Sequence, residues 1–315
     1  MTTSIKTVAV IGGGLMGHGI ALEFALHGYD VCLQSRSQES LVRCRSMIKV
    51  SAKTLVDLGK TTAESSSNVT ERIKFTTSLE AAASDADIVI ESIYEDINLK
   101  RSLFQKLDTL SRADAILASN TSSFLPSKLA EVTKHPERVL NVHYLNPPHI
   151  APFVEVVPSP LTLYEHTQIV MSLLRGVGKK PILLKHEVKG FVASRLQGAL
   201  LREALWLVEN DIVSANDVDM AISTGLGRRW SAAGVLQVLE FAGWDLLYRI
   251  EKDLFPHLST APDAPLLQEM VERGELGVKS GVGFYEWTPE KADSVRRMIA
   301  TELARDDHGT KNQSD

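Results

Sequence analysis

This sequence has few cysteines, no long apolar runs and no excess of positive charge. Two cysteines in 315 residues, Cys32 and Cys44, cannot form the disulfide framework of a small secreted protein. No apolar run reaches the roughly 18 residues of a membrane helix, and the first residues lack the basic start and apolar core of a signal peptide. The formal net charge is −5, so no basic field attracts nucleic acid or an anionic membrane. We therefore expect a cytoplasmic protein that binds neither. No group of residues has the spacing of a metal site, and we expect no metal.

The first half of the chain alternates short apolar runs with longer helical patterns. Strands are predicted at residues 7–12, 31–34, 73–76, 87–92, 115–119, 139–144, 153–157 and 181–184. Helices are predicted at 15–27, 37–58 and 96–110, with Gly28 and Gly59 as helix stops and an exposed loop at 60–69. This alternation is typical of a Rossmann-like α/β domain with a mostly parallel sheet.

The character of the sequence changes near residue 187, in a turn rich in lysine and glycine. Beyond it only helical patterns occur, at 191–209, 215–223 and 233–254. Ser214 and Asp217 have the spacing of a capping box at the start of the second of these helices. We therefore predict two domains, a Rossmann-like α/β domain at 1–187 and an all-α domain at 188–315.

A glycine motif follows the first predicted strand and opens the first predicted helix. Gly12, Gly14 and Gly17 form G-x-G-x-x-G, with Leu15 and Met16 between the last two. The first glycine permits a tight turn, the second lets the backbone approach a pyrophosphate, and the third lets the helix pack closely on the sheet. This context favours a dinucleotide site, with all five residues at the cofactor, over a structural glycine-rich turn.

The end of the second predicted strand departs from the NAD pattern. An acidic residue that accepts hydrogen bonds from the adenosine ribose is expected there, but the sequence has Ser35 followed by Arg36. A hydroxyl and a guanidinium suit a 2′-phosphate, because Arg pairs with phosphate through two parallel hydrogen bonds. These residues favour NADP(H) over NAD(H). The alternative is a solvated arginine in an enzyme that binds NAD.

Several motifs then occur in one order between about residue 5 and residue 288. They are "GGGLMGHGIA", "IVIESIYEDINLKRSLFQKLD", "ASNTSS", "HYLNPP", "FVEVV", "GFVASRL" and "LGVKSGVGFYEW". In this order they resemble the 3-hydroxyacyl-CoA dehydrogenase superfamily over nearly the whole chain. The resemblance implies an NAD(P)-dependent dehydrogenase that acts on CH–OH groups.

The resemblance also implies that His143 and Glu155 carry the chemistry. Oxidation of an alcohol by hydride loss needs a base for the hydroxyl proton, and imidazole titrates near pH ~6.5. A carboxylate on the far ring nitrogen fixes the tautomer and stabilises the imidazolium. A lone histidine is more often a satisfied core residue, but the ordered motifs favour catalysis.

Further positions match functional residues of the family. Ser122 and Asn146 match residues that hydrogen-bond the reacting oxygen or the nicotinamide amide. Glu95, Lys100 and Asn120 match residues that contact the cofactor. The resemblance therefore implies a site assembled from the ends of several strands.

Two segments depart from the family pattern and concern the substrate. Ser194 stands where the family usually has a substrate-binding asparagine, which leaves a shorter donor. The run "GLGRRWSAAG" at 225–234 replaces a "PMGP"-like run. It resembles the free-acid branch of the family, which includes lambda-crystallin/L-gulonate 3-dehydrogenase, L-carnitine dehydrogenase and a pyridoxine-breakdown dehydrogenase for a hydroxypyridine carboxylate. Arg228 or Arg229 could bind a free carboxylate through two hydrogen bonds, and the alternative is that both are solvated or lie in a dimer contact.

We therefore predict hydride transfer between nicotinamide and a 3-hydroxy or 3-keto carboxylate, or a related small hydroxy acid. A short-chain 3-hydroxyacyl-CoA (3-hydroxybutyryl-CoA) dehydrogenase is the alternative. A non-catalytic, crystallin-like dinucleotide-binding protein is an alternative of another class. The resemblance further implies a homodimer through the helical domain, where residues 199–210 and 234–250 are rich in bulky apolar side chains.

Overall fold

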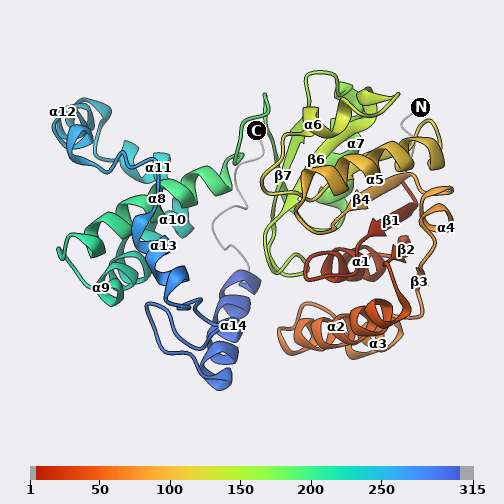
Figure 1. The fold of residues 1–315 in the computed structure, drawn as a ribbon, viewed down its shortest axis with the longest axis horizontal. Coiled ribbons are helices and arrows are strands. Elements are labelled where there is room, and N and C mark those ends of the chain that lie inside the picture. The colour runs from red at the N-terminus through yellow and green to blue at the C-terminus, as the bar shows by residue number, and fades with distance from the viewer. Residues whose placement is uncertain (1–4, 306–315) are drawn as a thin grey trace. The chain divides into compact units, whose positions relative to one another are not determined.

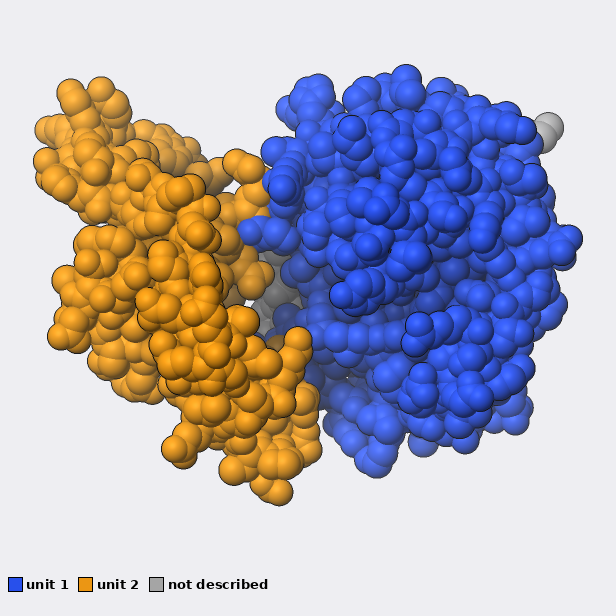
Figure 2. Space-filling model, in the orientation of Figure 1, with its two compact units in different colours: residues 1–194, 300–304 blue, residues 195–299, 305–315 orange. Residues whose placement is uncertain are grey.

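The computed structural model describes residues 5–305, which divide between two compact units. The first unit contains the described chain up to Ser194 together with Ala300–Ala304. The second contains Arg195–Ile299 and Arg305 (Figure 2). The first unit has α/β structure and the second is helical, which confirms the predicted fold class.

The first unit is built on one eight-stranded sheet (Figure 1). Its strand order is β3-β2-β1-β4-β5-β6-β7-β8, and all neighbouring pairs are parallel except β6 with β7. The strands are β1 Thr7–Ile11, β2 Asp30–Gln34, β3 Ile73–Thr76, β4 Ile88–Glu91, β5 Ile116–Ser119, β6 Val139–Tyr144, β7 Phe153–Pro158 and β8 Lys180–Leu183. The prediction of a mostly parallel sheet is confirmed, and every predicted strand is present.

Helices cover both faces of this sheet (Figure 1). They are α1 Gly17–Leu26, α2 Gln38–Asp57, α3 Ala63–Asn68, α4 Leu79–Ala83, α5 Ile97–Leu110, α6 Pro126–Ala130, the short η1 Pro136–Arg138 and α7 Tyr164–Gly176. Successive side chains of a strand point to opposite faces. Val8 and Val10 of β1 therefore join an apolar cluster with α1, α2 and α7, whereas Ala9 and Ile11 join another with α4, α5 and α6. Burial on both faces explains why the strands have continuous apolar runs.

Local sequence signals set several helix ends. Gly28 and Gly59 have φ angles of 83° and 68° just after α1 and α2, which confirms both as helix stops. The prediction of a loop at 60–69 is wrong for residues 63–68, which form α3. The Thr62 hydroxyl accepts a hydrogen bond from the Ser65 amide at 3.1 Å and so caps this short helix.

The second unit is helical. Its helices are α8 Ala193–Glu209, which begins in the first unit, α9 Ala215–Met220, the π-helical turn η2 Ala221–Leu226, α10 Gly227–Ala233, α11 Val235–Glu240, α12 Trp244–Leu254, η3 Phe255–His257, α13 Pro265–Glu272 and α14 Pro289–Ala304, which ends in the first unit. Ser214 caps α9 by accepting the Asp217 amide at 3.2 Å, as predicted. The carboxylate of Asp217 accepts a hydrogen bond from the Ser214 hydroxyl at 2.6 Å, not from the Ser214 backbone amide as in a full capping box. None of the helices in the described part of the chain is long and apolar enough to cross a membrane.

Two helix predictions in this unit need correction. The helix predicted at 215–223 ends at Met220 as an α-helix and continues through η2 into α10. The helix predicted at 233–254 is two helices, because Gly234 and Gly243 have φ angles of 73° and 85°. Positive φ is incompatible with a continuous α-helix and is readily adopted by glycine.

Candidate dinucleotide and catalytic site

Several of the residues predicted to act follow the carboxyl ends of strands in the first unit. β1, β4, β5 and β6 are parallel, so their carboxyl ends share one edge of the sheet. The strand order also reverses between β1 and β4, because β2 and β3 lie on the other side of β1. In open α/β sheets, ligands bind at the carboxyl ends of the strands beside such a reversal.

The turn after β1 suits the phosphates of a dinucleotide. Gly12 has a φ of 108°, and a Cβ there would lie 2.4 Å from the carbonyl oxygen of Ser92. A Cβ on Gly17 would lie 1.8 Å from the Gly12 carbonyl oxygen, so both positions require glycine. Around Gly14, by contrast, no atom lies within 4 Å of the place its Cβ would occupy. The backbone there is open to a pyrophosphate at the start of α1, where helix amides attract anions.

A buried histidine holds this glycine turn in place. Leu15 is exposed and Met16 is half-buried, whereas His18 is buried. Nδ1 of His18 lies 3.0 Å from the Gly14 carbonyl oxygen, and Nε2 lies 3.0 Å from the Ser51 hydroxyl. A carbonyl oxygen only accepts, so Nδ1 donates and His18 ties the turn to α2. Burial lowers the pKa of His18, which favours the neutral ring.

The residues after β2 adjoin the same turn. The Gly12 amide donates to the Gln34 carbonyl at 2.8 Å. Ser35 is buried, with its hydroxyl 2.7 Å from that of Ser40. Arg36 is exposed, and within residues 5–305 no group pairs with its guanidinium. In this fold the position after the second strand faces the adenosine ribose.

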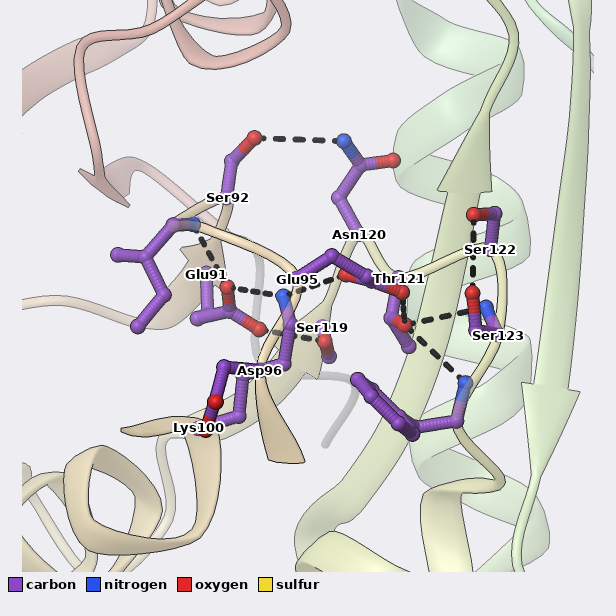
Figure 3. Close-up of polar contacts among 12 residues, drawn as sticks. Glu91, Ser92, Glu95, Asp96, Lys100, Ser119, Asn120, Thr121, Ser122 and Ser123 are labelled. Carbon is purple, nitrogen blue, oxygen red and sulfur yellow. Dashed lines mark hydrogen bonds and ion pairs between the residues drawn. The ribbon is translucent and has the colours of Figure 1, made fainter. Parts of the chain in front are cut away.

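A buried network of charges lies at the ends of β4 and β5 (Figure 3). Glu91 accepts a hydrogen bond from Lys100 Nζ at 2.6 Å. It also accepts bonds from the Ser119 hydroxyl at 2.5 Å and the Ile93 amide at 2.7 Å. Lys100 is fully buried and lies 3.2 Å from Glu95 Oε2 as well. Its ammonium therefore contacts two protein carboxylates, those of Glu91 and Glu95.

Glu95 is the more exposed end of this network. Thr121 donates a hydrogen bond to its Oε1, while Oε2 pairs with Lys100. Burial raises the pKa of Glu95, but the Thr121 hydroxyl and Lys100 lower it by more, and the net shift is downward. The carboxylate is thus ionised at neutral pH with both oxygens fixed, which suits it to accept a hydrogen bond from a ribose hydroxyl.

Asn120 joins the ends of three neighbouring strands. Its Nδ2 donates to the Ser92 hydroxyl at 3.3 Å (Figure 3). Its Oδ1 accepts the Tyr144 amide at 2.9 Å. Ser122, two residues along, is exposed and has a 3.4 Å contact with the Ser123 hydroxyl. Asn120 therefore shapes the edge of the sheet, while the hydroxyl of Ser122 is accessible to a ligand.

His143 and Glu155 face each other across the antiparallel pair β6 and β7, in register as cross-strand partners. Nδ1 of His143 lies 2.6 Å from Glu155 Oε2, and both residues are buried. Glu155 Oε1 accepts the amides of Val192 and Ala193 at 2.7 and 3.0 Å. An ionised carboxylate only accepts, so Nδ1 of His143 donates, and in the neutral ring Nε2 keeps a lone pair. This arrangement leaves His143 able to take a proton from a ligand.

Phe191 packs this pair against the start of α8. It has a φ of 48°, is fully buried, and its ring lies 5.5 Å from that of His143. A bulky residue with positive φ is uncommon, and here it follows Gly190, whose φ is 81°. These two residues turn the chain so that the next two amides point at Glu155. Ser194 follows directly and is half-buried.

The remaining predicted site residues lie apart from this buried pair. Asn146 is exposed in the turn after β6, where a cis peptide bond joins it to Pro147. Arg228 and Arg229 belong to the second unit, where both are exposed on α10. The first unit thus assembles all the predicted residues except these two arginines. No metal-binding group of three or more His, Cys, Asp or Glu side chains occurs within the described residues.

Sequence reasoning missed several buried polar residues that support the site. They are His18, Glu23, Glu91, Ser119, Thr121 and Lys179. One signal was available: Glu91 interrupts an apolar strand, and a charge in that position is almost never buried without a partner. The identity of that partner, Lys100, depends on how α5 packs and could not be read from spacing.

Two family models match the chain. The one described as 3-hydroxyacyl-CoA dehydrogenase, NAD binding domain, covers residues 7–188. The one described as 3-hydroxyacyl-CoA dehydrogenase, C-terminal domain, covers residues 190–287. Together they span most of the chain.

Relatives that act on different substrates align at similar identity. The 5-formyl-3-hydroxy-2-methylpyridine 4-carboxylate 5-dehydrogenase of Mesorhizobium japonicum is 35% identical over 94% of this chain and 97% of its own. The L-carnitine dehydrogenase of Bacillus cereus is 36% identical over 79% of this chain and 76% of its own. The 3-hydroxybutyryl-CoA dehydrogenase of Clostridioides difficile is 33% identical over 89% of this chain and 99% of its own. A solved structure of a 5-formyl-3-hydroxy-2-methylpyridine 4-carboxylic acid 5-dehydrogenase, described as NAD+-dependent, matches with a TM-score of 0.88 and 34% identity over 95% of this chain and 96% of that one.

The bonding of Glu155 predicts a measurable acid sensitivity. Burial raises the pKa of Glu155, but the hydrogen bonds from His143, Ala193 and Val192 lower it to a net value below its ordinary 4.5. A carboxyl group whose pKa is lower in the folded than in the unfolded chain stabilises the fold at pH values above the unfolded pKa. This stabilisation is lost as the pH falls through the pKa of the folded chain. At pH ~7 the unmodified chain should therefore have a larger free energy of unfolding than Glu155→Gln. This difference in the free energy of unfolding should become smaller below pH ~4.5.

Urea unfolding followed by circular dichroism at a series of pH values measures this difference. Glu71→Gln, at an exposed carboxylate, is the control for the substitution itself. A difference between the unmodified chain and Glu155→Gln that stays constant from neutral to acid pH would contradict the bonding described.

Proposed function

Because this chain belongs to the 3-hydroxyacyl-CoA dehydrogenase family, we propose that it transfers hydride between a nicotinamide dinucleotide and a 3-hydroxy or 3-keto carboxylate, or a related small hydroxy acid. The family predicted from the ordered motifs is confirmed, as is its reaction class, an NAD-linked oxidoreductase acting on CH–OH groups. The choice of acid and the roles of single residues are the content of the proposal.

The hydrogen bond between His143 and Glu155 is the observation that supports this function most directly. In the direction of oxidation, Nε2 of His143 removes the hydroxyl proton of the substrate while Glu155 holds the opposite ring nitrogen. The imidazolium that forms is stabilised by the adjacent carboxylate, whose lowered pKa keeps it ionised. In the direction of reduction, the same imidazolium returns the proton to the oxygen.

The other residues of this edge bind and orient. When bound, the nicotinamide supplies the hydride acceptor. Ser122 and Asn146, both exposed, donate to the reacting oxygen or the nicotinamide amide. Ser194, next to the amides that hold Glu155, contacts the substrate. Glu95 accepts a hydrogen bond from a ribose hydroxyl and is held for this by Lys100.

A preference for NADP(H) over NAD(H) is part of the proposal. Its support is the exposed Arg36 after β2, with which no group in the described part of the chain pairs. An acidic residue at this place would bind a ribose diol. A relative of solved structure is described as NAD+-dependent, so both nucleotides have to be compared directly.

Calorimetric titration should give tighter binding of NADPH than of NADH. Arg36→Ala should weaken NADPH binding by about tenfold, since a hydrogen bond to a charged group contributes roughly 1.5 kcal/mol or more, and should leave NADH binding unchanged. Arg175→Ala, at an exposed arginine on α7, is the matched control. Equal affinities that neither substitution alters would show that Arg36 is only solvated.

We propose that the enzyme recognises its substrate by a free carboxylate group. The pyridine-carboxylate and carnitine dehydrogenases named above act on free acids. The first exceeds the CoA-ester enzyme in identity and in the share of this chain that is covered, whereas the second has higher identity over a smaller share. A carboxylate beside nicotinamide needs a cationic partner, and an arginine provides two parallel hydrogen bonds. Arg228 and Arg229 of α10 are our candidates for this partner.

A panel of short 3-hydroxy acids, each assayed as the free acid and as its CoA thioester, tests this function. We expect kcat/KM to favour the free acids. Arg228→Met or Arg229→Met should lower kcat/KM for the free acids by about a hundredfold, because leaving one partner of a desolvated charge pair alone costs roughly 3 kcal/mol.

We expect only one of these two substitutions to abolish the preference for free acids, so the other substitution serves as its control. His143→Ala should lose most turnover and still bind the dinucleotide, which sets the background of the assay. Thioesters that react far faster than every free acid would overturn the choice of substrate. A His143→Ala variant with near-normal turnover would overturn the catalytic assignment.

Two other functions are alternatives from the sequence, a short-chain acyl-CoA dehydrogenase and a non-catalytic protein. The match to a 3-hydroxybutyryl-CoA dehydrogenase supports a short-chain acyl-CoA substrate. A non-catalytic, crystallin-like protein that binds dinucleotide has no need of a buried base with its orienting carboxylate. The 2.6 Å contact of His143 with Glu155 therefore favours an enzyme.

We further propose a homodimer through the helical unit. Large apolar side chains of α8, α11 and α12 and the adjoining loop are exposed in the single chain, among them Leu196, Leu236, Phe241, Tyr248 and Ile250. A surface of this composition usually marks a protein contact.

Sedimentation at micromolar concentration should give twice the mass of the chain. Phe241→Glu places a charge on a residue that is 90% exposed and should shift the protein to monomer, because a buried unpaired charge opposes association. Tyr164→Glu makes the same change at an exposed aromatic residue of the first unit and should leave the dimer intact. A monomeric unmodified chain would contradict the proposal.

A further inference from the structure

A buried ion pair in the first unit joins α1 to the turn between β6 and β7. Lys179, just before β8, has its Nζ 2.5 Å from Oε1 of Glu23 on α1. The same ammonium donates to the carbonyl oxygens of Pro148 at 2.6 Å and Ala151 at 2.9 Å. An ammonium group has three donors, so all three of Lys179 are used. Two of its three acceptors belong to the turn that carries Asn146.

The turn also packs directly on the backbone of α1. A Cβ on Gly19 would lie 2.7 Å from Nδ1 of His149 and 2.7 Å from Cγ of Pro148. Glycine inside a helix costs stability relative to alanine, and here the close approach of the turn explains it. The ring of His149 lies 5.7 Å from that of His18, which holds the Gly14 carbonyl. α1 therefore contacts both the glycine turn and the turn after β6.

Stability alone is a poor explanation for this ion pair. Burial raises the pKa of Glu23 to about 7, although the charge of Lys179 lowers it. Burial thus affects the pKa of this carboxyl more than the neighbouring ammonium does. Buried ion pairs of this kind often stabilise a fold less than apolar residues of the same volume, and some are retained because they fix one arrangement of the segments they join.

We propose that Glu23 and Lys179 are positioning residues, which hold the turn of residues 145–151 on α1 and so fix Asn146 relative to the dinucleotide. This inference rests on the proposed function, in which Asn146 contacts the reacting oxygen or the nicotinamide amide. Neither Glu23 nor Lys179 touches the substrate. Their effect on turnover comes through the place of Asn146, and a shift of about 1 Å in a group that orients substrate can cost roughly a hundredfold in rate.

Lys179→Met removes the ammonium and keeps a side chain of similar length. We expect kcat to fall by about a hundredfold while the affinity for the dinucleotide, measured by calorimetry, is unchanged. We also expect faster hydrogen exchange at the amides of Ile150 and Ala151, which donate to the Pro147 carbonyl. Glu23→Gln, which keeps the shape and an acceptor oxygen, should change both readouts in the same direction but less.

Arg138→Met is the matched control. It breaks another buried ion pair, Arg138 with Asp108 at 2.8 Å, next to the amino ends of β5 and β6. It should lower the melting temperature but leave kcat within about threefold of normal and leave exchange in the turn unchanged.

Equal losses of kcat in Lys179→Met and Arg138→Met would overturn the inference. So would normal kcat or normal exchange of the turn in Lys179→Met. If the unmodified enzyme turns over no hydroxy acid, the proposed function fails, and the exchange measurement still decides whether Lys179 holds the turn.

Discussion

The hydrogen bond between His143 and Glu155 is the contact to which the rest of the candidate site is attached. It exists because β7 returns antiparallel to β6 with these two residues in register. A slip of one residue would move the Glu155 side chain to the other face of the sheet. The second oxygen of Glu155 also accepts the amides of Val192 and Ala193, where α8 begins. One carboxylate thus joins two strands and the entry to the next helix.

The same edge of the sheet concentrates buried charge. Parallel strands leave polar backbone groups where they end, and charged side chains are buried there only with close partners. Glu91 and Lys100 meet this condition at the ends of β4 and β5, and their pairing fixes the loop that carries Glu95. A second pair, Glu23 with Lys179, fastens the turn after β6 to α1. The glycine turn, the Glu95 loop and the turn of Asn146 are therefore each held by bonds to buried or backbone partners.

Much of the fold followed from periodicity and from glycine. Short, mostly apolar runs predicted all eight strands found in the described residues, and the runs are longest where a strand is buried on both faces of the sheet. The predicted helices and loops were wrong where a single residue has more influence on the backbone than the hydrophobic pattern around it. Thr62 caps a helix in a stretch that has a loop-like composition, and Gly234 and Gly243 break a continuous helical pattern. A cap and a positive φ are local backbone events that averaged hydrophobicity does not report.

For the site, the sequence by itself determined the glycine turn, the place of Arg36 and the ordered motifs that named the family and pointed to His143 and Glu155. Each of these depends on neighbours along the chain, or on motifs whose order can be read directly. Only the tertiary structure decided that Lys100 is buried between two carboxylates, that Phe191 packs on His143, and that Lys179 reaches Glu23 and the turn after β6. These contacts join residues on different elements. A charged residue in a buried segment indicates that a partner is needed. Which residue becomes that partner depends on how the helices pack on the sheet.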